Sequence, residues 1–355
     1  MVIIINNMLY SNQERGDYMV NSHFIPQLIL RHFCEDEKIQ YYDLNSGNIE
    51  SKSTKSVFSE KGYYPENIEK DLCHKIEVQF ANILNNKILK ENYNIALTSE
   101  DLLTIKKYLI ITTLRVKDEN MEHNLWYKTL KRDGFIFEND PFKDIFSGDF
   151  YENMNKILEC QNKEELVRIA NKGENMNLFN YVKDVVFSYN VFVRTNNSKE
   201  DLIITDRGWA AYMGPIGVRK MNALMQSGRI EDAMLLQMVS PQDYGIFPLS
   251  RNMAIITMSP AYKQHLKGSG TRIIYPPHAP TLSACLGFGS EDTIEPPTNK
   301  FLKSGAMVYQ YKIKQLVKRD VIFLNSLLLD YANQFFGYAN ADKVRSSLKE
   351  KNIDI

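Results

Sequence analysis

The stretch PENIEKDLCHKIEVQFANILNNKILK, residues 65–90, carries a strong apolar repeat. Its apolar residues recur about once per helical turn, which predicts an amphipathic helix with one face in the core. The members of this stripe are Ile68, Leu72, Ile76, Phe80, Ile83 and Ile88. Glu69 and Glu77 flank the stripe eight residues apart, so they share one face of the predicted helix.

A second long helix is predicted downstream, over residues 100–130. Thr98 or Ser99 is a suitable N-cap, and the acidic residues Glu100 and Asp101 suit the positive end of the helix dipole. A short loop between the two helices predicts an antiparallel helical hairpin. Further helices are expected within 141–190, 214–239 and 305–335, and one core should contain Ile76, Phe80, Leu109, Ile111, Leu324 and Leu328.

Short segments with the residue pattern of β-strands interrupt the helical patterns. Residues 38–58 have a central Asn-Ser-Gly and predict a β-hairpin. Two more strands, 191–195 and 201–205, are separated by Asn-Asn-Ser-Lys-Glu, which indicates a second hairpin, and further strands are expected at 252–258 and 271–275. The predicted class is therefore α+β, with a mainly helical body and a small, mostly antiparallel sheet.

Composition narrows the class of protein. The chain has 355 residues with 43 basic and 43 acidic side chains, so no whole-chain basic field favours nucleic acid or membrane surfaces. Its four cysteines are scattered, which excludes a dense disulfide framework and fits a reducing cytoplasm. Apolar stretches end well before membrane length, so no membrane association is expected.

The first residues suggest a translated leader. Glu-Arg-Gly-Asp just before Met19 can be encoded by a purine-rich ribosome-binding sequence, so we expect residues 1–18 to be a leader or a mis-assigned start. The alternative is a genuine flexible N-terminal tail. No linker or repeat divides the rest, which predicts one domain over 19–345 and a tail at 346–355.

Short motifs occur in a characteristic order along the chain. They are His23, Pro26, Leu30 and Phe33 in HFIPQLILRHF; Glu69 and Glu77; Arg115; Asp206 in IITDRG; Pro248, Leu249 and Ser250; and Asn325 and Ala332. In these motifs the chain resembles a known bacterial family, the domain of unknown function 4238 (DUF4238). At the central motif this chain has Arg207 and Gly208 where the family has Asn and Pro. The family has no agreed activity, so the resemblance implies a fold and a list of residues rather than a reaction.

Each candidate has a structural alternative. His23 is a general acid/base or metal ligand, or else it caps a helix or bonds a buried backbone group. Glu69 and Glu77 act in chemistry, or they pair with Arg115. Asp206 ends a strand, where working side chains are common, but Asp before Gly is also ordinary turn chemistry. Arg207 contacts an anion or pairs with an acid, and Ser250 and Asn325 are further binding candidates.

Two functions remain open at this stage. One is a phosphodiester-acting hydrolase of a toxin or phage-defence type, acting on nucleic acid or a nucleotide, with His23, Glu69, Glu77, Arg115 and Asp206 as its catalytic set. Within it, His23, Glu77 and Asp206 would be candidate ligands for Mg or Mn. The other is a non-catalytic binding or sensing module. Both predict that His23 lies within reach of Glu69, Glu77, Arg115 or Asp206; the oligomeric state is left open.

Overall fold

The computed structural model describes residues 21–63, 66–115, 150–171, 182, 185–195, 199–212, 223–224, 226–229, 244–258, 298–301 and 307–355. The predicted helix at 100–130 is described only as far as residue 115. The helices expected over 141–190 and 214–239 are described in part, and the strand predicted at 271–275 lies outside the described residues.

The predicted helix at 65–90 is confirmed, but two of its turns are π-helical. It consists of α2 (Glu66–Leu72), a π-helical turn at Cys73–Glu77, α3 (Val78–Ile83) and a second π-helical turn at Leu84–Ile88. Its apolar stripe is buried. π-Helical turns are rare and frequently lie at functional sites, and the first of them contains Glu77.

The next helix, α4 (Ser99–Arg115), begins where the capping pattern predicts. The hydroxyl of Thr98 accepts from the N–H of Asp101 at 3.2 Å, and the Asp101 carboxylate accepts from the N–H of Thr98 at 2.8 Å. This reciprocal pair satisfies two backbone donors at the helix start. The connection to the preceding helix is a strand, β5 (Asn94–Thr98), rather than the predicted short loop.

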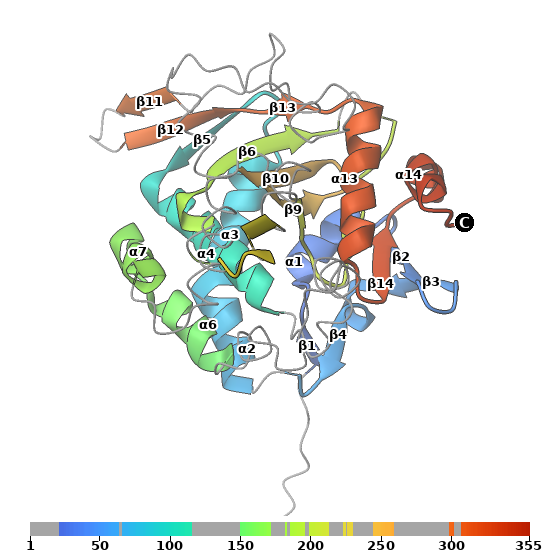
Figure 1. Cartoon of the computed structure of the whole chain (residues 1–355), viewed down its shortest axis with the longest axis horizontal. Coiled ribbons are helices and arrows are strands. Elements are labelled where there is room, and N and C mark those ends of the chain that lie inside the picture. The colour runs from blue at the N-terminus through green and yellow to red at the C-terminus, as the bar shows by residue number, and fades with distance from the viewer. Residues whose placement is uncertain are drawn as a thin grey trace, which may run out of the picture.

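The predicted class is wrong in its balance of helix and sheet. Among the described residues, 45% are helical and 29% lie in 14 strands, which form four separate sheets. The sheets, in strand order, are β1-β4, β13-β6-β10-β9-β8, β11-β12-β5 and β3-β2-β14-β7. Of the strand pairs that the structure describes, only β13 with β6 is parallel. Figure 1 shows the sheet that contains β6, β10 and β9 between α6 and α7 on one side and α13 on the other, with β2, β3 and β14 beyond α13.

The bounds of the strands explain why the sequence pattern under-predicts them. Most are only two to six residues long, too short for a clear alternation. They are β1 (Asn21–His23), β2 (Lys38–Asp43), β3 (Ile49–Ser53), β4 (Ser59–Lys61), β6 (Tyr189–Arg194), β7 (Ile204–Thr205), β8 (Ala210–Tyr212), β9 (Tyr244–Ser250), β10 (Met253–Met258), β11 (Thr298–Phe301), β12 (Met307–Lys312), β13 (Lys314–Gln315) and β14 (Phe335–Tyr338).

Strand pairing confirms one predicted hairpin and corrects the other. β2 and β3 pair antiparallel within 38–58, as predicted. The strands predicted at 191–195 and 201–205 do not pair with each other: β6 pairs with β10, whereas the two-residue β7 pairs with β14 in another sheet. A local turn signal was misleading here because both strands are buried and find partners far along the chain.

The helix predicted at 305–335 is half wrong. Residues 307–312 form β12, which pairs with β5 and β11, and the helix α13 (Lys318–Tyr331) begins later. The aromatic and β-branched residues Val308, Tyr309 and Tyr311 favour a strand, and the distant partner strand overrides the helical period. The six residues predicted to share one core do so.

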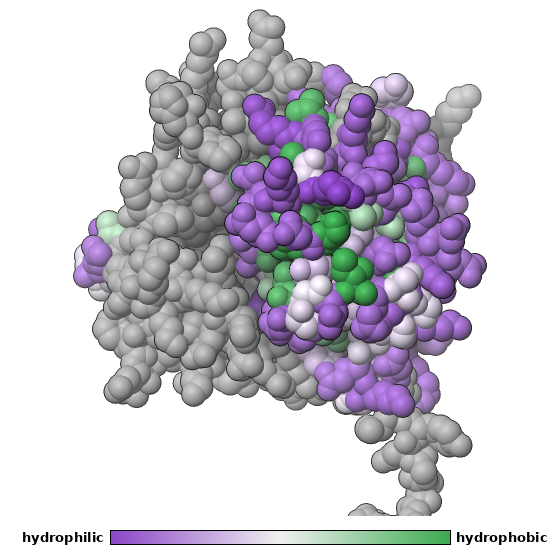
Figure 2. All heavy atoms as spheres, turned by 90° about the vertical axis from the view of Figure 1, so that its right-hand side faces the viewer, coloured by the Kyte–Doolittle hydropathy of each residue, from purple (hydrophilic) through white to green (hydrophobic). Residues whose placement is uncertain are grey.

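Shorter helices lie around this body, the first of them α1 (Gln27–Leu30). α6 (Phe150–Glu159) and α7 (Lys163–Asn171) lie within the region where further helices were expected. α14 (Arg345–Glu350) contacts α13 and lies on the side of the C-terminus. The residues coloured on that face in Figure 2 are mostly hydrophilic and surround a small apolar group.

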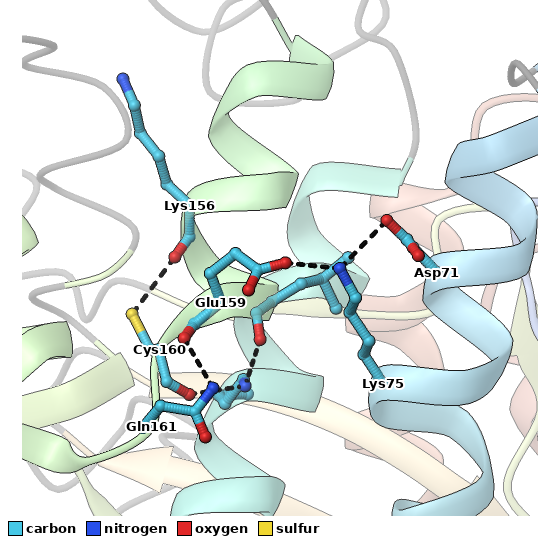
Figure 3. A network of polar contacts seen from close by, with 8 residues as sticks. Asp71, Lys75, Lys156, Glu159, Cys160 and Gln161 are labelled. Atoms are coloured by element: carbon cyan, nitrogen blue, oxygen red, sulfur yellow. Dashed lines mark hydrogen bonds and ion pairs between the residues drawn. The ribbon is translucent and has the colours of Figure 1, made fainter.

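Polar contacts tie the helix that carries the two glutamates to its neighbours (Figure 3). Lys75, in the first π-helical turn, pairs with Asp71 at 3.1 Å and with Glu159 at the end of α6. The buried ammonium of Lys107 in α4 donates to the carbonyls of Leu158, at 2.6 Å, and Cys160, at 2.8 Å. It thereby satisfies carbonyls that the end of α6 leaves without helical partners.

Candidate functional site

The site is built around Arg115, the last residue of α4. Its side chain is 1% exposed, and its Nη1 donates to the backbone carbonyl of His23 at 3.1 Å. Its Nη2 forms an ion pair with the carboxylate of Glu77. Arg115 therefore joins β1, α4 and the first π-helical turn. His23 lies within reach of Arg115, as predicted, but the contact is made by its backbone carbonyl and not by the ring nitrogens on which the prediction rests.

Glu69 belongs to the same cluster. Burial raises the pKa of its carboxyl group, and the negative charge of Glu77 raises it further, whereas Arg115 and the backbone N–H of His23 lower it. Its Oε2 is buried and has no hydrogen-bond partner within the part of the chain that the structure describes. A buried carboxyl group with a raised pKa holds its proton at higher pH than an ordinary glutamate.

His23 contributes the second titratable group. Its residue is 8% exposed, and desolvation by burial lowers the pKa of the imidazole, with Arg115 acting in the same direction. Hydrogen bonds to the backbone of Thr54 and the charge of Glu77 oppose this shift. The ring is therefore neutral at pH 7, and its buried Nε2 has no hydrogen-bond partner among residues 21–63, 66–115 and the other described ranges.

Cys73 marks the exposed side of this cluster, and the sequence analysis did not identify it. It lies four residues from both Glu69 and Glu77, inside the π-helical turn, and it is exposed. Burial of the thiol raises its pKa, and the charges of Glu77 and Glu69 raise it further. The spacing Glu-x3-Cys-x3-Glu was a usable signal, because residues four apart are neighbours on a helix.

Asp206 has a different environment from the other predicted catalytic residues. It is 5% exposed, and its carboxylate accepts hydrogen bonds from three successive backbone amides between α13 and β14: Asn333 at 2.8 Å, Gln334 at 2.7 Å and Phe335 at 2.9 Å. Burial raises the pKa of this carboxyl group, and the three amides oppose the shift. These three bonds tie Asp206 to the segment that enters β14 rather than to the side chains around Arg115.

The remaining predicted binding residues also make contacts within the fold. Arg207 donates from Nε to Asn333 at 3.0 Å, and Ser250 donates to Asn252 at 2.7 Å in the turn between β9 and β10. Asn325 is fully buried; its amide donates to the carbonyl of Asp201 and the hydroxyl of Ser347, while its oxygen accepts from the N–H of Ile203.

Neither a metal-binding group of side chains nor a membrane-spanning helix is found in the part of the chain that the structure describes. No group of three or more His, Cys, Asp or Glu side chains in the described ranges is placed to hold a metal ion, so His23, Glu77 and Asp206 do not form such a group. Among the described helices, none combines the length and the apolar character needed to cross a membrane.

A comparison with known protein families gives a match over most of the chain. A family model described as a protein of unknown function (DUF4238) matches residues 21–342. Neither a curated protein nor a solved structure matches the chain. The match confirms the resemblance found in the sequence motifs and covers every candidate residue named above.

Proposed function

The chain belongs to the DUF4238 family of proteins of unknown function, and we propose that it is a hydrolase in which His23 and Glu69 transfer protons. A phosphodiester of a nucleic acid or nucleotide is the substrate class that we propose. This makes the cluster of His23, Glu69, Glu77 and Arg115 its active site.

One observation carries the proposal: two titratable groups in one partly buried cluster have pKa values that are shifted toward each other. The pKa of His23 is lowered and that of Glu69 is raised, so a neutral imidazole and a protonated carboxyl coexist more readily than in solution. A proton acceptor beside a proton donor is the requirement of general acid–base hydrolysis. Buried polar atoms on both groups, Nε2 and Oε2, are without a hydrogen-bond partner among the described residues.

Glu77 and Arg115 supply fixed charge. The Arg115 guanidinium, paired with Glu77, is the cationic group of the cluster, and a positive charge stabilises the charge that develops on phosphoryl oxygens. Mg and Mn are included in the test because carboxylate oxygens are ligands for both ions. The three cysteines in the described ranges are free thiols, which supports the proposal of a reducing, cytoplasmic location.

A second candidate function rests on a different observation. Asp206, Ser250 and Asn325 use their side chains within the fold, and Arg115 joins three segments in the manner of a structural tie. A non-catalytic binding or sensing module requires only that these polar side chains stabilise the fold. The two candidates differ in whether His23 can be changed without loss of a chemical activity.

The test measures hydrolysis of single-stranded DNA, duplex DNA, RNA and bis(p-nitrophenyl) phosphate, each with Mg, with Mn and with chelator. The variants are His23→Asn and Glu69→Gln, and the matched control is Glu66→Gln, which alters an exposed carboxylate on the same helix. We expect a loss of about 100-fold or more in the two site variants, as for removal of a general acid or base. Absence of hydrolysis in every condition, or full activity in His23→Asn, would favour the binding module.

A further inference from the structure

We propose that the turn Asp206–Arg207–Gly208 is a positioning element of the site, which sets the gap between the segment after His23 and the end of α4. This inference rests on the proposed function, because it takes the cluster around His23 to be the active site. Its test measures a pKa and does not require that the protein hydrolyse any substrate. Asp206 then affects the proton-transferring groups by holding this turn in place, and it does not contact a substrate.

The turn is anchored on one side by Asp206. The carboxylate accepts from the amides of Asn333, Gln334 and Phe335, and the N–H of Asp206 donates back to the carbonyl of Phe335 at 3.0 Å. The N–H of Gly208 donates to the carbonyl of Thr205 at 2.9 Å, which closes the turn. Hydrogen bonds to a buried charged group are among the stronger ones in proteins, so the turn has a fixed place in the core.

The other side of the turn lies against the two segments that carry the site. A Cβ added at Gly208 would lie 2.6 Å from Cδ1 of Ile25 and 3.4 Å from Cγ2 of Thr112. Ile25 comes two residues after His23, and Thr112 comes three residues, or about one helical turn, before Arg115. Both side chains are buried, so neither can move into solvent.

These same two segments are joined directly by the hydrogen bond from Arg115 to the carbonyl of His23. The segment after His23 and the end of α4 therefore meet at two places: at the hydrogen bond from Arg115 to His23, and beside Gly208. Gly208 has a φ of +70°, a left-handed conformation that favours glycine, and an added Cβ would meet the tip of the Ile25 side chain, which must shift to admit it. Because Ile25 is 1% exposed, the packed core around its Cδ1 resists that shift, and we expect the resulting strain to displace the segment after His23 relative to the end of α4.

The experiment titrates the imidazole of His23 by NMR in the full chain without substrate, with the signal assigned by its absence in His23→Asn. Gly208→Ala adds the Cβ. The control Gly47→Ala adds a Cβ at a similar φ, +73°, where the nearest atom is the Tyr42 hydroxyl at 3.7 Å, an ordinary contact. The rescue variant is Gly208→Ala with Ile25→Val, since valine lacks the Cδ1 that the new methyl group would meet.

We expect Gly208→Ala to raise the pKa of His23, because separation relieves burial and moves Arg115 away, and these two influences lower it in the native chain. Glu77 and the backbone of Thr54 act in the opposite direction, and burial outweighs them. The double variant should return the pKa toward its native value, and Gly47→Ala should leave it unchanged. Equal titrations in Gly208→Ala and the native chain, or no rescue by Ile25→Val, would overturn the proposal.

A second variant serves if Gly208→Ala does not fold. Asp206→Asn weakens the anchor without adding volume, and an unchanged His23 titration in that variant would overturn the proposal as well. Failure of the proposed function gives a different result, since a chain that hydrolyses nothing would still show the shift and its rescue. Where hydrolysis is found, its pH profile should move with the pKa of His23 in the same variants.

Discussion

The guanidinium of Arg115 donates to the backbone carbonyl of His23 across 3.1 Å, although 92 positions separate the two residues in the chain. The same guanidinium pairs with Glu77. One buried side chain thus fixes the place of a histidine on a strand relative to a carboxylate on a helix. Any chemistry at this cluster depends on that arrangement.

The first prediction concerns the pair of Arg115 and Glu77. Replacement of Arg115 by Met leaves the carboxylate of Glu77 and the carbonyl of His23 without the donor that they share. Removal of one partner of a buried pair costs about 3–5 kcal/mol, and we expect the lower end because the Glu77 side chain is 20% exposed. Urea unfolding at neutral pH measures the loss.

A double variant tests the cause of that loss. Arg115→Met with Glu77→Gln removes the uncompensated charge, so the double variant should be more stable than Arg115→Met alone. Additive losses from the two single changes would mean that the pair contributes no coupling energy, and the Arg115 contact with His23 would then carry the effect.

The second prediction is a pH dependence of stability caused by His23. Burial lowers the pKa of the folded imidazole below its ordinary value of 6.5, so the unfolded chain binds the proton more tightly. This contribution to stability is present above pH 6.5 and is lost as the pH falls through the folded pKa. His23→Gln should lose less stability than the native chain between pH 7.5 and 5.5.

His32 supplies the comparison for that measurement. Its pKa is also lowered by burial, so His32→Gln should remove a separate part of the same pH dependence. Identical pH profiles in His23→Gln and the native chain would contradict the buried, neutral state of His23.

The third prediction concerns the reactivity of Cys73. Its thiol is exposed, but burial of the thiol group and the nearby charges of Glu77 and Glu69 raise its pKa, so less thiolate is present at pH 7.5. Alkylation by iodoacetamide should be slower than for an unperturbed cysteine and faster in Glu69→Gln. Mass spectrometry of the modified peptide, with Cys73→Ser as the blank, measures both rates; equal rates with and without Glu69 would remove the electrostatic cause.

Local pattern was sufficient for some elements and not for others. The stripe from Ile68 to Ile88 predicts its helix because each apolar residue is buried by the same face. The π-helical turn at Cys73–Glu77 leaves that stripe intact, so the apolar period does not reveal it. β12 was predicted as helix because its partner β5 lies far earlier in the chain, where no local signal points to it.

The sequence likewise predicts some features of the site and not others. The family motifs include His23, Glu69, Glu77 and Arg115, and the structure brings these four residues together, although periodicity alone does not bring a strand, a helix and a helix end together. Asp206 is a candidate because it matches the central motif and ends a predicted strand. Its partners are backbone amides 127 to 129 residues later. Backbone donors carry no sequence signature, so that anchoring role could be seen only in the structure.

The fourth prediction tests the anchoring role of Asp206 itself. Asparagine has the same shape, but it replaces one acceptor oxygen with an NH2 group that faces backbone donors. One carboxylate oxygen accepts from Gln334 and Phe335 and the other from Asn333, so either orientation of the amide loses at least one bond and leaves a buried N–H without its acceptor. The expected cost is about 2 kcal/mol, typical of a lost hydrogen bond to a charged group. Thermal and urea unfolding at pH 8 should show this cost.

Asp43→Asn is the matched control for that variant, because the carboxylate of Asp43 also accepts a backbone N–H, that of Asn45 at 2.9 Å, but near the surface. It should cost well under 1 kcal/mol, since water replaces the lost bond. Hydrogen exchange adds a local readout: in Asp206→Asn the amides of Gln334 and Phe335 should exchange faster, while those of β2 and β3 keep their protection. Equal stability and unchanged exchange in Asp206→Asn would show that β14 is held by its strand partners β2 and β7 alone.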